Sequence, residues 1–324
     1  MLSLGALLLV SSAGALACGS DDNPAAGGSG GAGGGAGSGA SGGAGGSSGG
    51  SGGSGGGPSC DKGPGYHDNT PPAHVDLFDG KVIDLDGNPL ADVQTTVCGV
   101  DICSELGTTN AAGDVVTCES GPVGVCKTGI APGFALKKPA FKYGLGLSVA
   151  KFALLLPPGQ TSYDVGEQST AKFPPFSAGQ PLVAGAEAAN GPARIKLEPG
   201  TVMKFEFEFV TAEERRFRAV EIPSDKAPDA VDASLGFAWL VATTPTDTSF
   251  CPKATLVLDN SGNLAAGADV ELWLHGVKVE EEWAPYGGWA KVSDAKVSAD
   301  GSNIETVPGQ GVPLLGTYGV RLKP

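Results

Sequence analysis

The sequence predicts an all-β protein in which two β-sandwich domains follow a disordered Gly/Ser-rich tether. Three observations lead to this fold class. Residues 203–209 alternate apolar with charged side chains, which is the period of a strand with one buried and one wet face. Other short apolar runs are separated by turn residues, and helix signals are nearly absent. From Ala25 to Gly57 the chain contains only Gly, Ala and Ser, which offer too little apolar surface to fold.

Residues 1–17 form a leader, with an apolar run from Leu4 to Val10 and small residues before Cys18. The run is shorter than the roughly 20 residues that a spanning helix needs, and it fits a secretory signal peptide. The usual basic start is missing, because no Lys or Arg precedes Lys62.

The ending Leu16-Ala17-Cys18 resembles a bacterial lipoprotein lipobox, with Ala15 where that family usually has Leu. The resemblance implies cleavage before Cys18 and acylation of this residue, so that a lipid anchor joins the protein to a membrane. Gly19 after the cysteine points to the outer membrane or the cell surface. The alternative is an ordinary signal peptide that leaves Cys18 in the mature chain. Residues 18–74 are then the lipidated cysteine and its flexible tether.

The net charge of the chain limits the classes of partner that it can bind. The chain has a formal net charge of −14 and no cluster of Lys or Arg. Such a chain gains nothing from counterion release, so we expect no nucleic-acid partner. Anionic lipid head groups repel the same charge, so the attachment to a membrane has to be covalent.

Cysteine usage fits an exported protein, in which disulfides are the default. The six cysteines after Cys18 allow 15 pairings, between which the sequence alone does not choose. We expect two local pairs, Cys98–Cys103 and Cys118–Cys126, which leave Cys60 to pair with Cys251. A zinc site is the competing interpretation. It lacks the C-x-x-C spacing, and the three histidines are scattered along the chain, so we expect no metal and no cofactor.

The first folded unit is predicted over residues 75–156. Residues 75–97 have the pattern of a hairpin around a turn from Asp86 to Pro89, in which Gly87 supplies the positive φ of a tight turn. A second turn is expected at 108–114, and one or two further strands between 133 and 157.

This unit resembles the carboxypeptidase regulatory-like domain. The resemblance rests on G-x-V at Gly80, D-x-x-G-x-P-L from Asp84 and T-x-x-x-G from Thr109, and it covers residues 76–120 with an extension to 156. It implies a small prealbumin-like β-sandwich. Asp114 stands where the family usually has an aromatic residue, which leaves the strand register open. Peptidase activity is not implied, because His67, His74 and His275 form no H-x-x-E pair.

A Pro- and Gly-dotted link is predicted over 157–185, and a second, immunoglobulin-like or adhesin-like sandwich over 186–324. The clearest strand is expected at 202–210. The other strands expected in this unit are 216–222, 236–242, 254–259, 269–275 and 318–323.

One stretch, residues 280–290, carries a candidate ligand site with Glu281, Trp283, Tyr286 and Trp289 around a Pro/Gly turn. Exposed aromatic rings bind the apolar faces of sugars, and carboxylates accept hydrogen bonds from sugar hydroxyls. The alternative is that the rings fill the end of the core while the Glu run is solvated.

The sequence therefore predicts a non-catalytic lipoprotein with a structural or adhesive role, whose partner is a polysaccharide or a surface protein. A carbohydrate-binding module is the alternative. We expect no enzyme activity, because no nucleophile or metal constellation is assembled.

Overall fold

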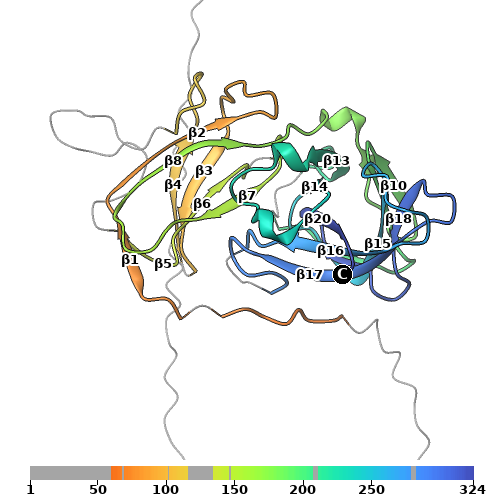
Figure 1. The fold of residues 1–324 in the computed structure, drawn as a ribbon. Helices are drawn as coiled ribbons and strands as arrows, with labels where there is room; N and C mark the ends of the chain where they lie inside the picture. Colours follow the sequence, from red (N-terminus) through yellow and green to blue (C-terminus); the bar gives the residue numbers. More distant parts are fainter. Residues whose placement is uncertain are drawn as a thin grey trace, which may run out of the picture. The chain divides into compact units, whose positions relative to one another are not determined.

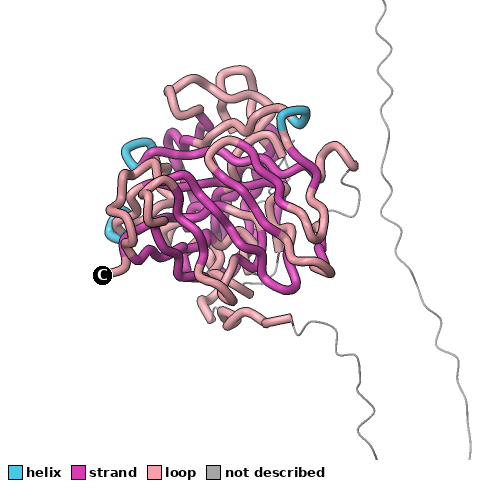
Figure 2. Tube along the Cα trace, turned by 90° about the vertical axis from the view of Figure 1, so that its right-hand side faces the viewer, coloured by secondary structure: helices cyan, strands magenta, loops and turns pink. Residues whose placement is uncertain are grey.

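A computed structural model of the chain describes residues 60–67, 69–100, 102–115, 134–145, 147–206, 211–278 and 282–324. The leader, Cys18, the Gly/Ser tract, and the pair Cys118 and Cys126 lie outside the described residues. Ser54–Pro324 forms one compact unit. Strands dominate it, and short 3₁₀ turns are the helices of the described part (Figure 2). The predicted all-β class is confirmed, and none of the helices described is long enough to cross a bilayer.

The first strand set comprises β1 to β8 (Figure 1). Two pairs flank its main sheet. β1 (Pro72–Val75) is antiparallel to β5 (Phe134–Lys137), and β2 (Leu77–Ile83) is parallel to β8 (Ser162–Ser169). The main sheet has the order β4-β3-β6-β7 and consists of β4 (Cys103–Thr108), β3 (Gln94–Cys98), β6 (Ala140–Tyr143) and β7 (Phe152–Leu155).

The expectation of a hairpin over residues 75–97 is wrong. The turn itself forms, with Gly87 at φ +83° and the Asp84 carboxylate accepting the backbone N–H groups of Asp86 and Asn88, both at 2.9 Å. Beyond one bridge between Ile83 and Pro89, however, the two strands separate. β2 pairs with β8, whereas β3 pairs with β4 and β6. Period-two apolar residues on both sides of a turn suit an arch between two sheets as well as a hairpin.

Part of the predicted link 157–185 is regular secondary structure. They include β8, the 3₁₀ turn η1 (Phe176–Ala178) and the short strand β9 (Gln180–Pro181), which pairs with β13. Arg218 lies under this stretch with 1% of its surface exposed. Its guanidinium stacks 4.0 Å from the Phe176 ring and donates to the carbonyls of Pro174 at 2.8 Å and Leu147 at 2.6 Å.

The second strand set, β9 to β20, forms one twelve-stranded sheet. Its order is β10-β11-β15-β18-β17-β16-β20-β14-β13-β9, and β12 and β19 pair with β15. Its remaining strands are β10 (Glu187–Asn190), β11 (Ala193–Lys196), β12 (Val202–Lys204), β13 (Arg216–Pro223), β14 (Trp239–Thr244), β15 (Ser249–Asp259), β16 (Asp269–His275), β17 (Trp289–Val297), β18 (Asn303–Thr306), β19 (Val312–Leu314) and β20 (Thr317–Leu322). Two 3₁₀ turns, η2 (Ser224–Lys226) and η3 (Ala233–Leu235), lie between β13 and β14.

The predicted strands of this set fall on β12, β13, β14, β15, β16 and β20, with β16 matching its expected bounds. Of the expected strand 202–210, residues 207–210 lie outside the described part. The sheet curls until its ends meet. The Asn190 side chain accepts the N–H of Ala219 at 3.1 Å and donates to the carbonyl of Ala178 at 2.8 Å. These side-chain hydrogen bonds join the two ends of the sheet, in place of the backbone hydrogen bonds between strands that would otherwise close it.

The two strand sets share a core. Ile222, Leu240 and Ala242 of the second set belong to the same buried cluster as Phe78 and Phe141 of the first. Burial of a Leu or Ile side chain contributes about 1.5–3 kcal/mol, so these contacts hold the two sets firmly together.

Two of the three predicted disulfides are confirmed. Cys98–Cys103 closes the turn between β3 and β4, and Cys60–Cys251 joins the start of the described chain to β15, across a sequence separation of 191. The chain therefore enters the folded unit at the second strand set, although the strands of the first set come next in sequence.

Candidate functional site

The predicted aromatic loop connects β16 to β17, and its rings serve packing. Tyr286 has none of its surface exposed and lies against Cys98, Ala140 and Ala153 of the first strand set. Burial raises the pKa of its hydroxyl. The expectation that Tyr286 offers a ring to a sugar is therefore wrong.

Trp289 is also enclosed by neighbours. Its ring centroid lies 4.7 Å from that of His275 and 4.9 Å from that of Phe237. Its indole N–H donates to the carbonyl of Ala230 at 3.0 Å. Two neighbouring rings and a satisfied indole N–H are the contacts expected of a tryptophan that packs in a core.

Trp283 is covered by the entering segment. The Lys253 ammonium lies 4.8 Å from the centroid of its ring, and a Cβ at Gly63 would come within 2.9 Å of the ring. The next residue of the predicted Glu run, Glu282, accepts the Gly65 N–H at its carbonyl (3.0 Å) and the Gly63 N–H at its carboxylate (3.3 Å). Glu281 lies outside the described residues. Of the three rings Tyr286 is buried completely, whereas Trp283 and Trp289 are partly buried and are contacted by their neighbours.

A cavity of about 220 Å³ adjoins this loop. Trp283 and Glu282 lie on its wall, together with Lys278, Lys204 and Asp247. A concave site with converging polar groups is the usual form of a small-ligand site. Two of these charged groups form ion pairs with residues outside the lining, Asp247 with Lys151 and Lys278 with Glu206.

A buried ion pair lies beside the cavity, because Asp247 is one of the lining residues. The Lys151 ammonium and the Asp247 carboxylate are 2.6 Å apart, and each side chain is 2% exposed. A second pair, Lys278–Glu206, is 3.0 Å apart and about one-third exposed. Burial by itself would raise the pKa of Asp247, but Lys151 and Lys278 outweigh it and the pKa of Asp247 is lowered. Burial, and then the charge of Asp247, raise the pKa of Glu206.

The ion pair also joins the two strand sets. Lys151 precedes β7, and its carbonyl accepts the Thr317 hydroxyl of β20 at 3.2 Å. Asp247 lies in the turn between β14 and β15, where its backbone has a φ of +68° and its N–H donates to the Leu315 carbonyl at 2.7 Å. A non-glycine residue in the left-handed region is costly, and the surrounding contacts have to hold it there.

His275 makes a second polar link between the sets. Its Nε2 accepts the backbone N–H of Ala153 in β7 at 3.0 Å, so its Nδ1 carries the proton that is donated to the Gly288 carbonyl at 3.0 Å. Both ring nitrogens are used in this neutral form. Burial lowers the pKa of His275 to about 4. A histidine fixed in this way supports structure and is unsuited to proton transfer near neutral pH.

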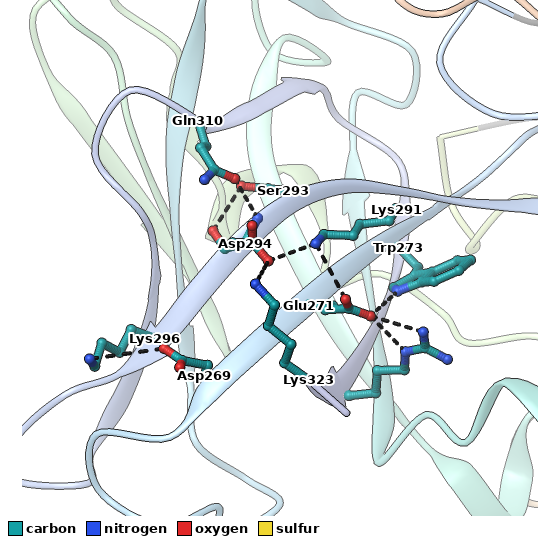
Figure 3. A network of polar contacts seen from close by, with 10 residues as sticks. Asp269, Glu271, Trp273, Lys291, Ser293, Asp294, Lys296, Gln310 and Lys323 are labelled. Carbon is teal, nitrogen blue, oxygen red and sulfur yellow. Dashed lines mark hydrogen bonds and ion pairs between the residues drawn. The ribbon is translucent and has the colours of Figure 1, made fainter.

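A charged network lies on the sheet of the second strand set (Figure 3). Glu271 accepts from the Trp273 indole at 3.1 Å and from Arg321 at 2.9–3.0 Å. Lys291 bridges Glu271 at 3.3 Å to Asp294 at 2.8 Å. Opposite charges on neighbouring strands stabilise a sheet face, and each charge in this network has a partner of opposite sign.

Comparisons with known proteins give no relative: no family model, no curated protein and no solved structure matches the chain. Within the described ranges, no three His, Cys, Asp or Glu residues are placed to hold a metal ion.

Sequence reasoning missed Lys151, Asp247 and Glu206. A lysine beside an apolar run and an aspartate in a Thr/Pro-rich turn are typical of solvated loops, and no local signal shows that they meet. His275 was noticed only as a histidine without metal-ligand spacing.

Asp247→Asn is expected to lower the free energy of unfolding by about 3–5 kcal/mol, because it takes the carboxylate from a buried ammonium. Urea unfolding of the full chain measures this. The matched control is Glu167→Gln, which breaks the exposed 3.3 Å pair with Lys81 and should cost about 1 kcal/mol or less. Equal costs for the two variants would show that the buried pair does not hold the strand sets together.

The protein should lose stability as the pH falls from 6.5, the ordinary pKa of His275, towards its folded pKa of about 4. In this window the unfolded chain binds more protons than the folded one, so the stability that is complete above pH 6.5 declines by about 3 kcal/mol. Unfolding midpoints measured between pH 7 and 4 should fall less steeply for His275→Gln than for the natural protein. The same pH dependence of the unfolding midpoint in both proteins would show that His275 is not the group that takes up this proton on unfolding.

Proposed function

We propose that this chain is an exported protein held at a membrane by lipid on Cys18, and that its folded unit serves there as a non-catalytic structural or binding element. The lipobox-like ending at Cys18 carries the proposal. The disulfides Cys60–Cys251 and Cys98–Cys103 support it, because such bonds persist in oxidising compartments outside the cytosol.

In this proposal the tether sets how far the folded unit can lie from the lipid anchor. Residues 19–59 would span on the order of 35 Å as a coil, and several times that distance when stretched. The disulfide at Cys60 then fixes the end of this tether to β15. We further propose that the first strand set belongs with the carboxypeptidase regulatory-like domains, on the motifs around Gly80, Asp84 and Thr109.

A binding or structural role is favoured over catalysis because two charged groups of the 220 Å³ cavity, Asp247 and Lys278, are held in ion pairs with Lys151 and Glu206. Sugar binding by the 280–290 loop is the weaker candidate. Tyr286 is buried, and Trp283 and Trp289 make packing contacts on their faces.

Metabolic labelling tests the anchor. In a Gram-negative host fed a radioactive fatty acid, the natural protein should carry label and sediment with the membrane fraction. Cys18→Ser should lose the label and move to the soluble fraction, whereas Cys60→Ser should keep it, because Cys60 is a disulfide residue. A labelled Cys18→Ser variant, or one that stays with the membrane, would contradict the proposal.

A further inference from the structure

The ion pair between Lys151 and Asp247 is the most enclosed one in the part of the chain that the structure describes. Each of its side chains is 2% exposed, whereas those of the next most enclosed pair, Arg321–Glu271, are 20% and 9% exposed. The Lys151 nitrogen and the Asp247 carboxylate oxygen are 2.6 Å apart, across a sequence separation of 96. An amine and a carboxyl group held in contact in a dry interior are the two reactants of an amide bond.

The backbones of both residues are fixed to one short segment. The Thr317 hydroxyl donates to the Lys151 carbonyl at 3.2 Å, and the Asp247 N–H donates to the Leu315 carbonyl at 2.7 Å. Leu315 and Thr317 lie at the start of β20, so the same stretch of chain positions both reactants. Well-oriented groups in one molecule react as if their concentration were about 10⁵–10⁸ M.

Burial favours the neutral product over the ion pair. A dry interior disfavours both charges, and transfer of one proton from the ammonium to the carboxylate gives a neutral amine and a neutral carboxylic acid. This proton stays within the pair, so the step needs no exchange with solvent. Condensation then replaces two buried charges by a neutral amide and releases one water molecule. Asp247 lines the 220 Å³ cavity, which has room for that water.

A third carboxyl group, that of Glu206, interacts electrostatically with the pair. It lies 3.0 Å from the ammonium of Lys278 and is partly buried. Burial, and then the charge of Asp247, raise the pKa of Glu206, so it takes up a proton more readily than an ordinary glutamate. A group of this kind is suited to general acid–base catalysis, which accelerates a reaction by about 10²–10⁴-fold.

We propose that the Lys151 amine and the Asp247 carboxyl group condense to an intramolecular amide, with Glu206 carrying the proton that the reaction moves. The amine nitrogen attacks Cγ of Asp247, and a C–N bond forms while the electron pair of the C=O bond moves onto its oxygen. Glu206 takes a proton from the nitrogen and gives one to the hydroxyl group. The C–O bond then breaks, the carbonyl re-forms and water leaves, so no oxidant or reductant is needed.

The amide joins the two strand sets covalently, because Lys151 precedes β7 and Asp247 follows β14. The ion pair described above is the state before this reaction. The modification goes beyond the proposed function and does not depend on the lipid anchor. It suits a structural element, since the two strand sets stay joined even when the fold opens.

Peptide mass spectrometry of the purified full-length protein tests the bond, after reduction of the disulfides and digestion with trypsin. Trypsin does not cleave after an acylated lysine, so Lys151 should remain inside the peptide Tyr143–Lys172. This peptide should be joined to Ala227–Lys253, which contains Asp247. The joined species should weigh one water molecule less than the two peptides together.

Three comparisons serve as controls. Lys291 contacts Asp294 at 2.8 Å, but these side chains are 35% and 23% exposed, so trypsin should cleave after Lys291. The variant Lys151→Arg keeps a cation beside Asp247 but has no amine that can condense, and it should give Ala227–Lys253 free. Glu206→Gln should lower the joined fraction of freshly purified protein about ten-fold or more.

The proposal is overturned if the natural protein is cleaved after Lys151 and gives no joined peptide, or if Lys151→Arg still gives one. The natural protein decides the first point by itself, whether or not the variant folds. A Glu206→Gln protein with an unchanged circular dichroism spectrum and the same joined fraction would overturn the role given to Glu206. Because the bond is read from peptide masses and the anchor from fatty-acid label, the failure of one is distinguishable from the failure of the other.

Discussion

The buried contact between Lys151 and Asp247 is the interaction on which the described unit depends most. Neither charge is stable in a dry interior without the other, so the β7 side of the first strand set has to stay against the β14–β15 turn of the second. His275 adds a neutral hydrogen bond to the same strand through Ala153. Around these polar links the shared apolar core excludes water, which strengthens them in turn.

This arrangement gives the aromatic rings of the loop between β16 and β17 a role in packing. Tyr286 and Trp289 are large and partly polar, and the structure uses them to fill the contact between the strand sets. Trp283 is covered by the entering segment that the Cys60–Cys251 disulfide holds in place.

Local pattern was enough to predict the all-β class, the bounds of β16 and the Cys98–Cys103 disulfide, and Cys60–Cys251 was predicted only as the remaining pair. Alternation reports which face of a strand is buried, and cysteines a few residues apart have few other partners. Local pattern did not predict which strands pair. The turn at Asp86–Pro89 was expected to join two paired strands, and it joins strands of different sheets. The Lys151–Asp247 ion pair could not be predicted from local pattern for the same reason, since the two residues meet only through tertiary structure.

Hydrogen exchange followed by mass spectrometry through a urea series, on the oxidised protein at pH 7, tests most directly whether the two strand sets unfold together. If the shared core and the buried pair unite the strand sets, the amides of β3, β6 and β7 should open with the same free energy and urea dependence as those of β14, β16 and β20. Opening of the first set at lower urea, while the second remains protected, would show that the two sets are independent bodies and would contradict the account.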